Sequence, residues 1–176
     1  MVARIRTRLV IDTDVVRAAG GKAAAFPTSK ECRDFLEAVL TICHGMALSR
    51  ELYAEWRRHQ SRFAYKWRLS MLGHRKLAYM GDASNEGFRD AIASLPLTEK
   101  EREVILKDLH LVEAAMASDR VVVSRDEEAR SSFRKAACHI PELRDIMWVN
   151  PTEDPGSVLR WLSEGAERRT DFLLGS

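Results

Sequence analysis

The chain is poor in cysteine, and its cysteines stand far apart. Only Cys32, Cys43 and Cys138 occur among 176 residues, and no two of them form a CxxC pair. A disulfide framework or a zinc site of the usual kind needs more cysteines at closer spacing. We therefore expect three buried or idle thiols and a protein of the reducing cytoplasm.

Long apolar runs and a strong excess of one charge are also missing. No apolar run approaches the roughly 18 residues of a membrane-spanning helix, so we expect neither a membrane segment nor a secretory signal. Lysine and arginine total 28 against 26 aspartates and glutamates, which leaves a net charge of +2. This balance alone requires no polyanionic partner, and any basic surface must therefore be local.

The residues that are present suit one globular domain, because 45% of a 176-residue chain is hydrophobic. Short apolar runs, rich in β-branched residues, predict strands over residues 8–12, 46–48, 121–123 and 146–149. Capping boxes at Thr28–Glu31 and Thr98–Glu101 each open a predicted helix, and Ser49 caps another. Further helices are predicted over residues 127–137 and 157–168, with a short one over 88–92.

Strands that alternate with helices predict a three-layer α/β/α sandwich around a parallel sheet of four or five strands. We expect residues 1–150 to form this domain, with a basic helical insertion at about residues 57–97. Residues 151–176 are expected to form a C-terminal helical extension that packs on the same domain.

Several acidic residues are predicted to meet at one edge of this sheet. Asp12 and Asp126 follow two of the apolar strands, and functional groups of parallel sheets gather at the carboxyl ends of strands. Asp108 interrupts the apolar stripe of its predicted helix, which costs several kcal/mol unless a cation or donors compensate. Glu55 is the candidate fourth acid, with Glu51 one turn earlier as its rival.

These acids admit a metal-binding and a purely structural interpretation. Converging carboxylates repel one another, and a hard cation such as Mg²⁺ or Mn²⁺ removes that penalty. Alternatively, Asp126 is only a helix N-cap, Asp108 pairs with an arginine and Glu55 is a solvated helix residue. Among the five histidines none is predicted to act, and His110 points sideways from Asp108 on their helix.

At these positions the sequence resembles the PIN-domain family of metal-dependent nucleases, which includes the VapC-type toxins. Residues 9–16, LVIDTDVV, resemble the opening motif of the family, with its first acid at Asp12. Residues 48–55 are similar to the strand and helix that carry the second acid, assigned to Glu55. Residues 108–115 and 121–126 resemble the segments that carry the third acid, Asp108, and the fourth, Asp126.

The resemblance implies a PIN-like sandwich and an endoribonuclease that hydrolyses RNA phosphodiester bonds. One or two Mg²⁺ or Mn²⁺ ions would activate water for in-line attack, so no protein nucleophile is needed. A toxin of a toxin–antitoxin pair is one role that it allows. It assigns the metal ligands and catalytic residues to Asp12, Glu55, Asp108 and Asp126, with Asp14 and Ser124 in support. The interval between Glu55 and Asp108 is longer than we expect in a compact VapC-type toxin.

Residues 56–76 form a basic segment, with seven cations and no acid. Aromatic residues are interleaved with these cations, which suits a surface that neutralises phosphates and stacks on bases. The candidate RNA contacts are Arg57, Arg58, Arg62, Lys66 and Arg68. The alternatives are that the aromatics Trp56, Phe63 and Trp67 pack inward, or that the segment docks an antitoxin, another acidic protein or a second subunit.

The leading hypothesis is thus a cytoplasmic, Mg²⁺- or Mn²⁺-dependent PIN-like ribonuclease with an RNA substrate. The alternative is a catalytically silent PIN-like module that binds RNA or a protein.

Overall fold

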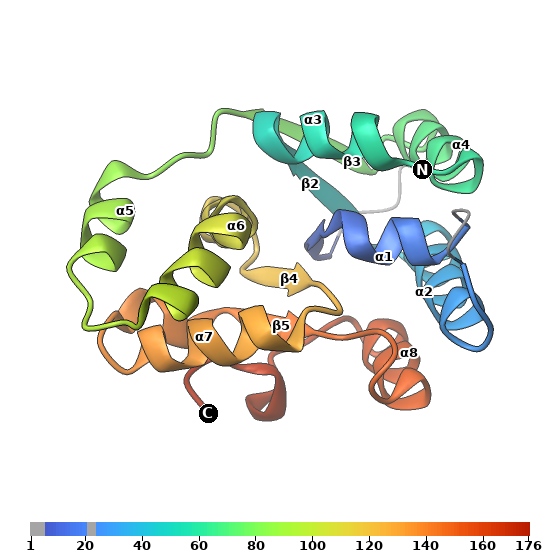
Figure 1. Cartoon of the computed structure of the whole chain (residues 1–176). Helices are drawn as coiled ribbons and strands as arrows, with labels where there is room; N and C mark the ends of the chain where they lie inside the picture. The colour runs from blue at the N-terminus through green and yellow to red at the C-terminus, as the bar shows by residue number, and fades with distance from the viewer. Residues whose placement is uncertain (1–5, 21–23) are drawn as a thin grey trace.

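The computed structural model describes residues 6–20 and 24–176, so residues 1–5 and 21–23 of the predicted domain lie outside the described residues. Its core is a sheet of five strands in the order β3-β2-β1-β4-β5 (Figure 1). All neighbouring strands are parallel. The strands are β1 (Arg8–Ile11), β2 (Gly45–Ser49), β3 (Leu77–Gly81), β4 (Val121–Val123) and β5 (Met147–Val149).

Helices cover both faces of this sheet, which confirms the predicted three-layer α/β/α sandwich. Helix α2 packs against α1, α4 and α8, while α6 packs against α7 on the other side of the sheet (Figure 1). The helices are α1 (Thr13–Ala18), α2 (Thr28–Thr41), α3 (Arg50–His59), α4 (Arg62–Gly73), α5 (Glu86–Ala93), α6 (Glu99–Met116), α7 (Glu127–Ala137) and α8 (Pro155–Ser163). Two 3₁₀ turns, η1 (Pro141–Asp145) and η2 (Thr170–Phe172), complete the chain. Within the described ranges, no helix is both long and apolar enough to cross a bilayer.

The segment at residues 57–97 differs from the predicted helical insertion. Besides α4 and α5 it contains β3, which is the edge strand of the central sheet beside β2. No residue of β3 is fully buried. An edge strand of this kind lacks the continuous β-branched run that marks a strand buried on both faces, so the sequence pattern misses it.

The C-terminal residues pack on the same domain, as expected. Leu173 forms an antiparallel bridge with Met147 of β5, and the Leu174 amide donates to the Ile146 carbonyl at 2.9 Å. This contact covers the free edge of β5. A domain boundary at residue 150 stays a prediction.

Two of the three predicted helix caps are confirmed. The Ser49 hydroxyl accepts from the Leu52 amide, and Thr98 and Glu101 form a reciprocal capping box. The capping box at Thr28 is wrong, because Pro27 occupies the N-cap position and Thr28 is already the first helical residue. The helix also ends earlier than expected, at Thr41, since β2 begins at Gly45.

Two tryptophans of the basic segment pack inward, as the structural alternative for this segment proposed. Trp56 is fully buried, and its indole Nε1 donates to the Ile11 carbonyl at 2.9 Å. Trp67 is buried beside it, with 5.9 Å between the two ring centroids. Trp56 therefore ties α3 to the end of β1, one residue before Asp12, and neither ring is free to stack on a base.

All three cysteines are free thiols, and they differ in exposure. Cys32 is buried, Cys43 is half-buried and Cys138 is exposed. The expectation of unpaired thiols is confirmed, although only Cys32 belongs to the core.

Candidate functional site

The strand order places several acids at one point of the sheet. From β1 the chain proceeds outward to β2 and β3, and then crosses back to β4 and β5 on the other side. In such sheets the crevice for ligands lies at the carboxyl ends of the strands where the order reverses. Here that point is between β1 and β4, which are followed by Asp12 and by Ser124 and Asp126.

Ser124 is the buried hub of these acids. Its hydroxyl donates to Asp12 Oδ2 at 2.8 Å and lies 3.4 Å from Asp14 Oδ2. Ser124 Oγ also accepts from the Asp126 amide at 3.1 Å. The Arg125 amide donates to Asp14 Oδ2 at 2.9 Å. The structure thus brings together the predicted supporting pair, Asp14 and Ser124, with two of the predicted ligands.

Asp14 and Asp108 carry buried oxygens that no donor satisfies. Asp14 Oδ1 and Asp108 Oδ2 have no hydrogen-bond partner among the described residues. Burial, reinforced by the charge of Asp12, raises the pKa of Asp14 to about 7 and that of Asp108 to about 6. Ionisation of these two carboxylates therefore costs free energy in the folded state, as expected where a cation is to be bound.

Asp12 and Asp126 each have a structural role as well. Asp126 Oδ1 accepts from the Ala129 amide at 2.8 Å and caps α7, which confirms the N-cap interpretation. Asp12 caps α1 through Oδ1, which accepts from the Asp14 amide. In each residue the second oxygen remains on the side of the cluster, Asp12 Oδ2 against Ser124 and Asp126 Oδ2 toward Lys107.

Lys107 is the cation that the acids share in this structure. Its Nζ lies 3.2 Å from Asp126 Oδ2 and 3.9 Å from Asp108 Oδ2. Burial lowers the pKa of Lys107, but the charges of Asp108 and Asp126 outweigh it and raise that pKa overall. Because the side chain is 70% exposed, it can leave without disturbing the core. The expected partner of Asp108 was an arginine, and the structure has this lysine instead.

The donor set suits a hard cation, but its members are not closed into a cage. In the part of the chain that the structure describes, no three His, Cys, Asp or Glu side chains stand together at metal-ligand spacing. The acids offer carboxylate oxygens, which are the ligands that Mg²⁺ and Mn²⁺ prefer, and a bound cation would relieve their mutual repulsion. Two of their buried oxygens also lack a donor within residues 6–20 and 24–176.

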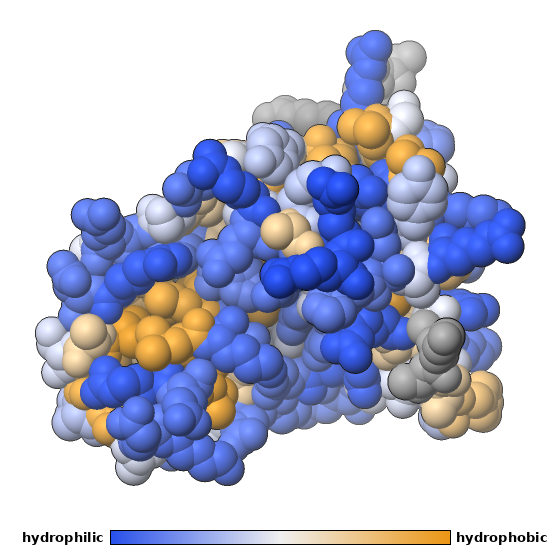
Figure 2. All heavy atoms as spheres, turned by 45° about the horizontal axis from the view of Figure 1, so that its top comes forward, coloured by the Kyte–Doolittle hydropathy of each residue, from blue (hydrophilic) through white to orange (hydrophobic). Residues whose placement is uncertain are grey.

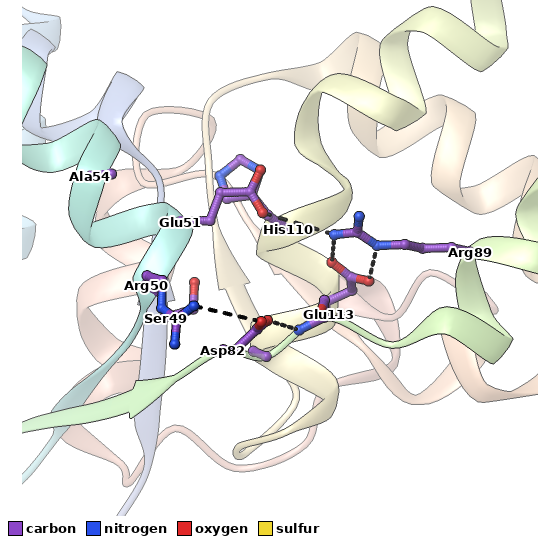
Figure 3. A pocket seen from close by; sticks show the side chains of 10 residues that line it. Ser49, Arg50, Glu51, Ala54, Asp82, Arg89, His110 and Glu113 are labelled. Carbon is purple, nitrogen blue, oxygen red and sulfur yellow. Dashed lines mark hydrogen bonds and ion pairs between the residues drawn. The ribbon is translucent and has the colours of Figure 1, made fainter.

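The structure pairs Glu55, the predicted second acid, with His110. Glu55 Oε2 is 3.2 Å from His110 Nε2, and this contact lowers the pKa of Glu55. Burial lowers the pKa of His110, but the contact with Glu55 and its charge outweigh the effect of burial, so the pKa of His110 is raised overall. Sequence reasoning missed this pair, because residues 108–115 of α6 are all buried and the 3.6-residue period does not single out His110. The rival acid, Glu51, faces Arg89 in a neighbouring cavity (Figure 3).

Five of the seven cations of the basic segment lie on α3 and α4, whereas Arg75 and Lys76 follow α4, and Lys76 is buried. Arg57, Arg58, Arg62 and Lys66 are exposed, and Arg68 is half-buried. Arg68 lies over the rings of Tyr53 and Tyr65, with 5.3 and 5.7 Å to the ring centroids. With the α3 side of the molecule brought forward, Figure 2 shows a largely hydrophilic surface broken by apolar patches.

No family model, curated protein or solved structure matches this chain.

The burial of Asp108 leads to a prediction about stability. We expect Asp108→Asn to stabilise the metal-free fold at neutral pH by about 3 kcal/mol, because the amide removes a charge that burial and Asp12 penalise. Because the pKa of Asp108 is raised in the folded state, its ionisation destabilises the wild-type fold, and the penalty is complete only above a pH of about 6. This penalty fades as the pH falls through about 6, so the gain should fade with it. Urea unfolding in EDTA at several pH values measures this.

Asp90→Asn is the matched control, since Asp90 is exposed on α5. An equal stabilisation by both variants, or a gain for Asp108→Asn that grows toward acid pH, would contradict the prediction.

Proposed function

We propose that this chain is a Mg²⁺- or Mn²⁺-dependent endoribonuclease of the PIN type. The observation that carries the proposal is the convergence of Asp12, Asp14, Asp108 and Asp126 at the reversal point of the sheet, with two buried oxygens unsatisfied. Acids serve stability poorly in such a place, whereas they serve cation binding well. The resemblance of residues 9–16, 108–115 and 121–126 to the family motifs also supports it.

The chain's own groups have distinct parts in this proposal. Asp12, Asp108 and Asp126 would hold the ion, with Glu55 as the fourth ligand. When bound, the ion neutralises phosphate charge and activates the attacking water. Ser124 orients Asp12 by donating to Oδ2, and the Arg125 amide orients Asp14 in the same way. Lys107 lies at the rim, where its ammonium group can leave Asp126 and pair with an incoming phosphate.

Single-stranded or structured RNA is the proposed substrate, and the cytoplasm the proposed compartment. The exposed cations Arg57, Arg58, Arg62 and Lys66 on α3 and α4 are proposed to contact its phosphates. The likeness of the motifs to VapC-type toxins extends the proposal to a toxin whose acidic antitoxin, or a second subunit, docks on the same helices.

A catalytically silent module that binds RNA or a protein is the second candidate. Lys107 favours it, because its ammonium already lies between Asp108 and Asp126. The absence of a preformed ligand group in residues 6–20 and 24–176 favours it as well.

Cleavage of a mixed substrate panel separates the two candidates. The purified protein is incubated with single-stranded RNA, structured RNA and DNA, in Mn²⁺ or in EDTA, with Asp126→Asn as the control for contaminating nucleases. The proposal predicts RNA cleavage by the wild type alone and only with metal. RNA that is bound in a retention assay but never cleaved would support the silent module.

Lys107 gives a second, independent test. We expect Lys107→Ala to bind Mn²⁺ about 2–5 times more tightly than the wild type, since removing an exposed competing cation is worth up to about 1 kcal/mol. Isothermal calorimetry of the EDTA-treated protein measures the affinity. Lys100→Ala is the control, because Lys100 is an exposed lysine of the same helix paired with Glu128. Unchanged affinity in Lys107→Ala would mean that Lys107 does not compete for the site.

The basic segment predicts a salt effect. We expect the combined Arg58→Ala, Arg62→Ala and Lys66→Ala variant to bind single-stranded RNA more weakly. Its plot of log affinity against log salt should be shallower by about 2, as expected for three lost phosphate contacts. Fluorescence anisotropy in EDTA measures both quantities. An unchanged salt slope would place RNA on another face.

A further inference from the structure

A polar cavity of about 400 Å³ adjoins the acid cluster, at the carboxyl ends of β2 and β3. Its walls come from the start of α3, the residues after β3, α5 and α6. His110 is shared between the two places, because it lines this cavity and contacts Glu55. Through His110 the cavity adjoins Glu55, the proposed fourth ligand, and the cavity volume falls within the range of small-molecule sites.

One wall of the cavity is held together by the buried acid Glu113. Glu113 is almost completely buried and accepts from Arg89 Nε at 2.7 Å and from Arg89 Nη2 at 2.8 Å (Figure 3). It also accepts from the Asn85 amide at 2.8 Å. These three bonds hold α5 and the segment before it against α6. Glu113 is thus a structural acid, and it leaves the binding of a ligand to the other residues.

The rim, in contrast, carries acids and bases that are only loosely paired. Glu51 lies 3.9 Å from Arg89, and Arg50 lies 3.9 Å from Asp82. The side chains of Glu51 and Arg50 are 61% and 70% exposed, and the structure shows no side-chain hydrogen bond for either among the described residues. Carboxylate acceptors and guanidinium donors therefore face one cavity with their hydrogen-bonding capacity unused (Figure 3).

Guanine is the base that uses both kinds of group at once. Its N1–H and N2–H₂ are adjacent donors that match one carboxylate, and its O6 and N7 are adjacent acceptors that match one guanidinium. The other RNA bases lack the paired donors. Proteins read unpaired RNA bases through these same edges.

We propose that this cavity is a guanine subsite that selects the nucleotide beside the cleaved phosphodiester, with Glu51 reading the N1–H and N2–H₂ donors and Arg50 the O6 and N7 acceptors. This inference rests on the proposed ribonuclease function for its place in the reaction. Asp82 has the lesser part, because its Oδ1 already accepts from the Ser84 amide at 3.0 Å. Glu51, the rejected rival for the metal site, thereby becomes a specificity residue.

The test measures binding without cleavage. A fluorescein-labelled nine-nucleotide oligouridylate is compared by anisotropy in EDTA with the same RNA carrying guanosine at its central position. A third RNA carries inosine there, which keeps N1–H, O6 and N7 but lacks the N2 amino group. We expect the guanosine RNA to bind about tenfold more tightly than oligouridylate, and the inosine RNA to fall between them.

Glu51→Gln should bring the guanosine preference close to one while the affinity for oligouridylate is unchanged or higher. The matched control is Glu164→Gln, which removes one exposed negative charge far from the cavity in sequence and should keep the preference. Equal binding of all three RNAs by the wild type, or a preference that survives in Glu51→Gln, would overturn the subsite.

Failure of the subsite and failure of the nuclease proposal are distinguishable. Metal-dependent cleavage without any guanosine preference would remove the subsite and leave the nuclease. A guanosine preference in EDTA, together with no cleavage in Mn²⁺, would keep the subsite in a silent binding module.

Discussion

Asp12→Asn is expected to reduce Mn²⁺-dependent RNA cleavage by at least about a hundredfold. Loss of an outer partner of a metal ligand typically costs 10–100-fold, and loss of a ligand carboxylate should cost no less. The fold should survive, because the single asparagine oxygen can still accept from the Asp14 amide. Its amide nitrogen can donate to Ser124 Oγ, whose hydroxyl can then donate to Asp14 Oδ2. Initial cleavage rates and thermal melting by circular dichroism measure the two properties on one preparation.

Asp90→Asn is again the control, since it removes an exposed carboxylate on α5. Full activity of Asp12→Asn would remove Asp12 from the catalytic set. Loss of activity together with loss of the folded signal would call for Asp108→Asn instead, which is expected to be inactive and more stable than the wild type.

Trp56→Ala is expected to have the largest effect on stability, about 3–5 kcal/mol, because it empties a fully buried indole site. Trp56→Phe keeps most of the volume but leaves the Ile11 carbonyl without its donor, so it should cost about 1–3 kcal/mol. Urea unfolding followed by circular dichroism gives both values.

Tyr65→Ala is the comparison within the same basic segment, because Tyr65 is exposed on α4. It should cost less than about 1 kcal/mol. A cost for Tyr65→Ala that equals the cost for Trp56→Ala would contradict the inward packing of the tryptophan.

The strands that the sequence predicted are those buried on both faces. Leu9-Val10-Ile11 and Val121-Val122-Val123 are continuous apolar runs, and they form β1 and β4 in the centre of the sheet. Edge strand β3 was missed, because its half-buried residues carry no such run. The local rule for a capping box succeeded at Thr98 and failed at Thr28, where Pro27 takes the cap position.

The acids were found because their signals are local. Asp12 and Asp126 follow apolar strands, and Asp108 interrupts an apolar stripe, so topology rules suffice to place them at one edge. The contacts that decide their chemistry are not local. Lys107 reaches Asp126, and His110 reaches Glu55, from positions that only the packing of α6 brings near.

The cavity beside the cluster shows the same limit. Arg89 and Glu113 are 24 residues apart in sequence and on different helices, and no pattern in the chain pairs them. The sequence predicts only a short helix over residues 88–92 in this region, yet this pair fixes α5 against α6. The proposed recognition residues Glu51 and Arg50 line a cavity only because Arg89 of α5 and Glu113 of α6 form another part of its wall.

A calorimetric titration of the EDTA-treated wild type with Mn²⁺, alongside Asp12→Asn, Asp108→Asn and Asp90→Asn, tests the metal centre most directly. A metal centre at these acids predicts saturable binding by the wild type and Asp90→Asn, and its loss in the two cluster variants. Absence of saturable binding in the wild type, or equal binding by all four proteins, would contradict a metal centre built from these acids.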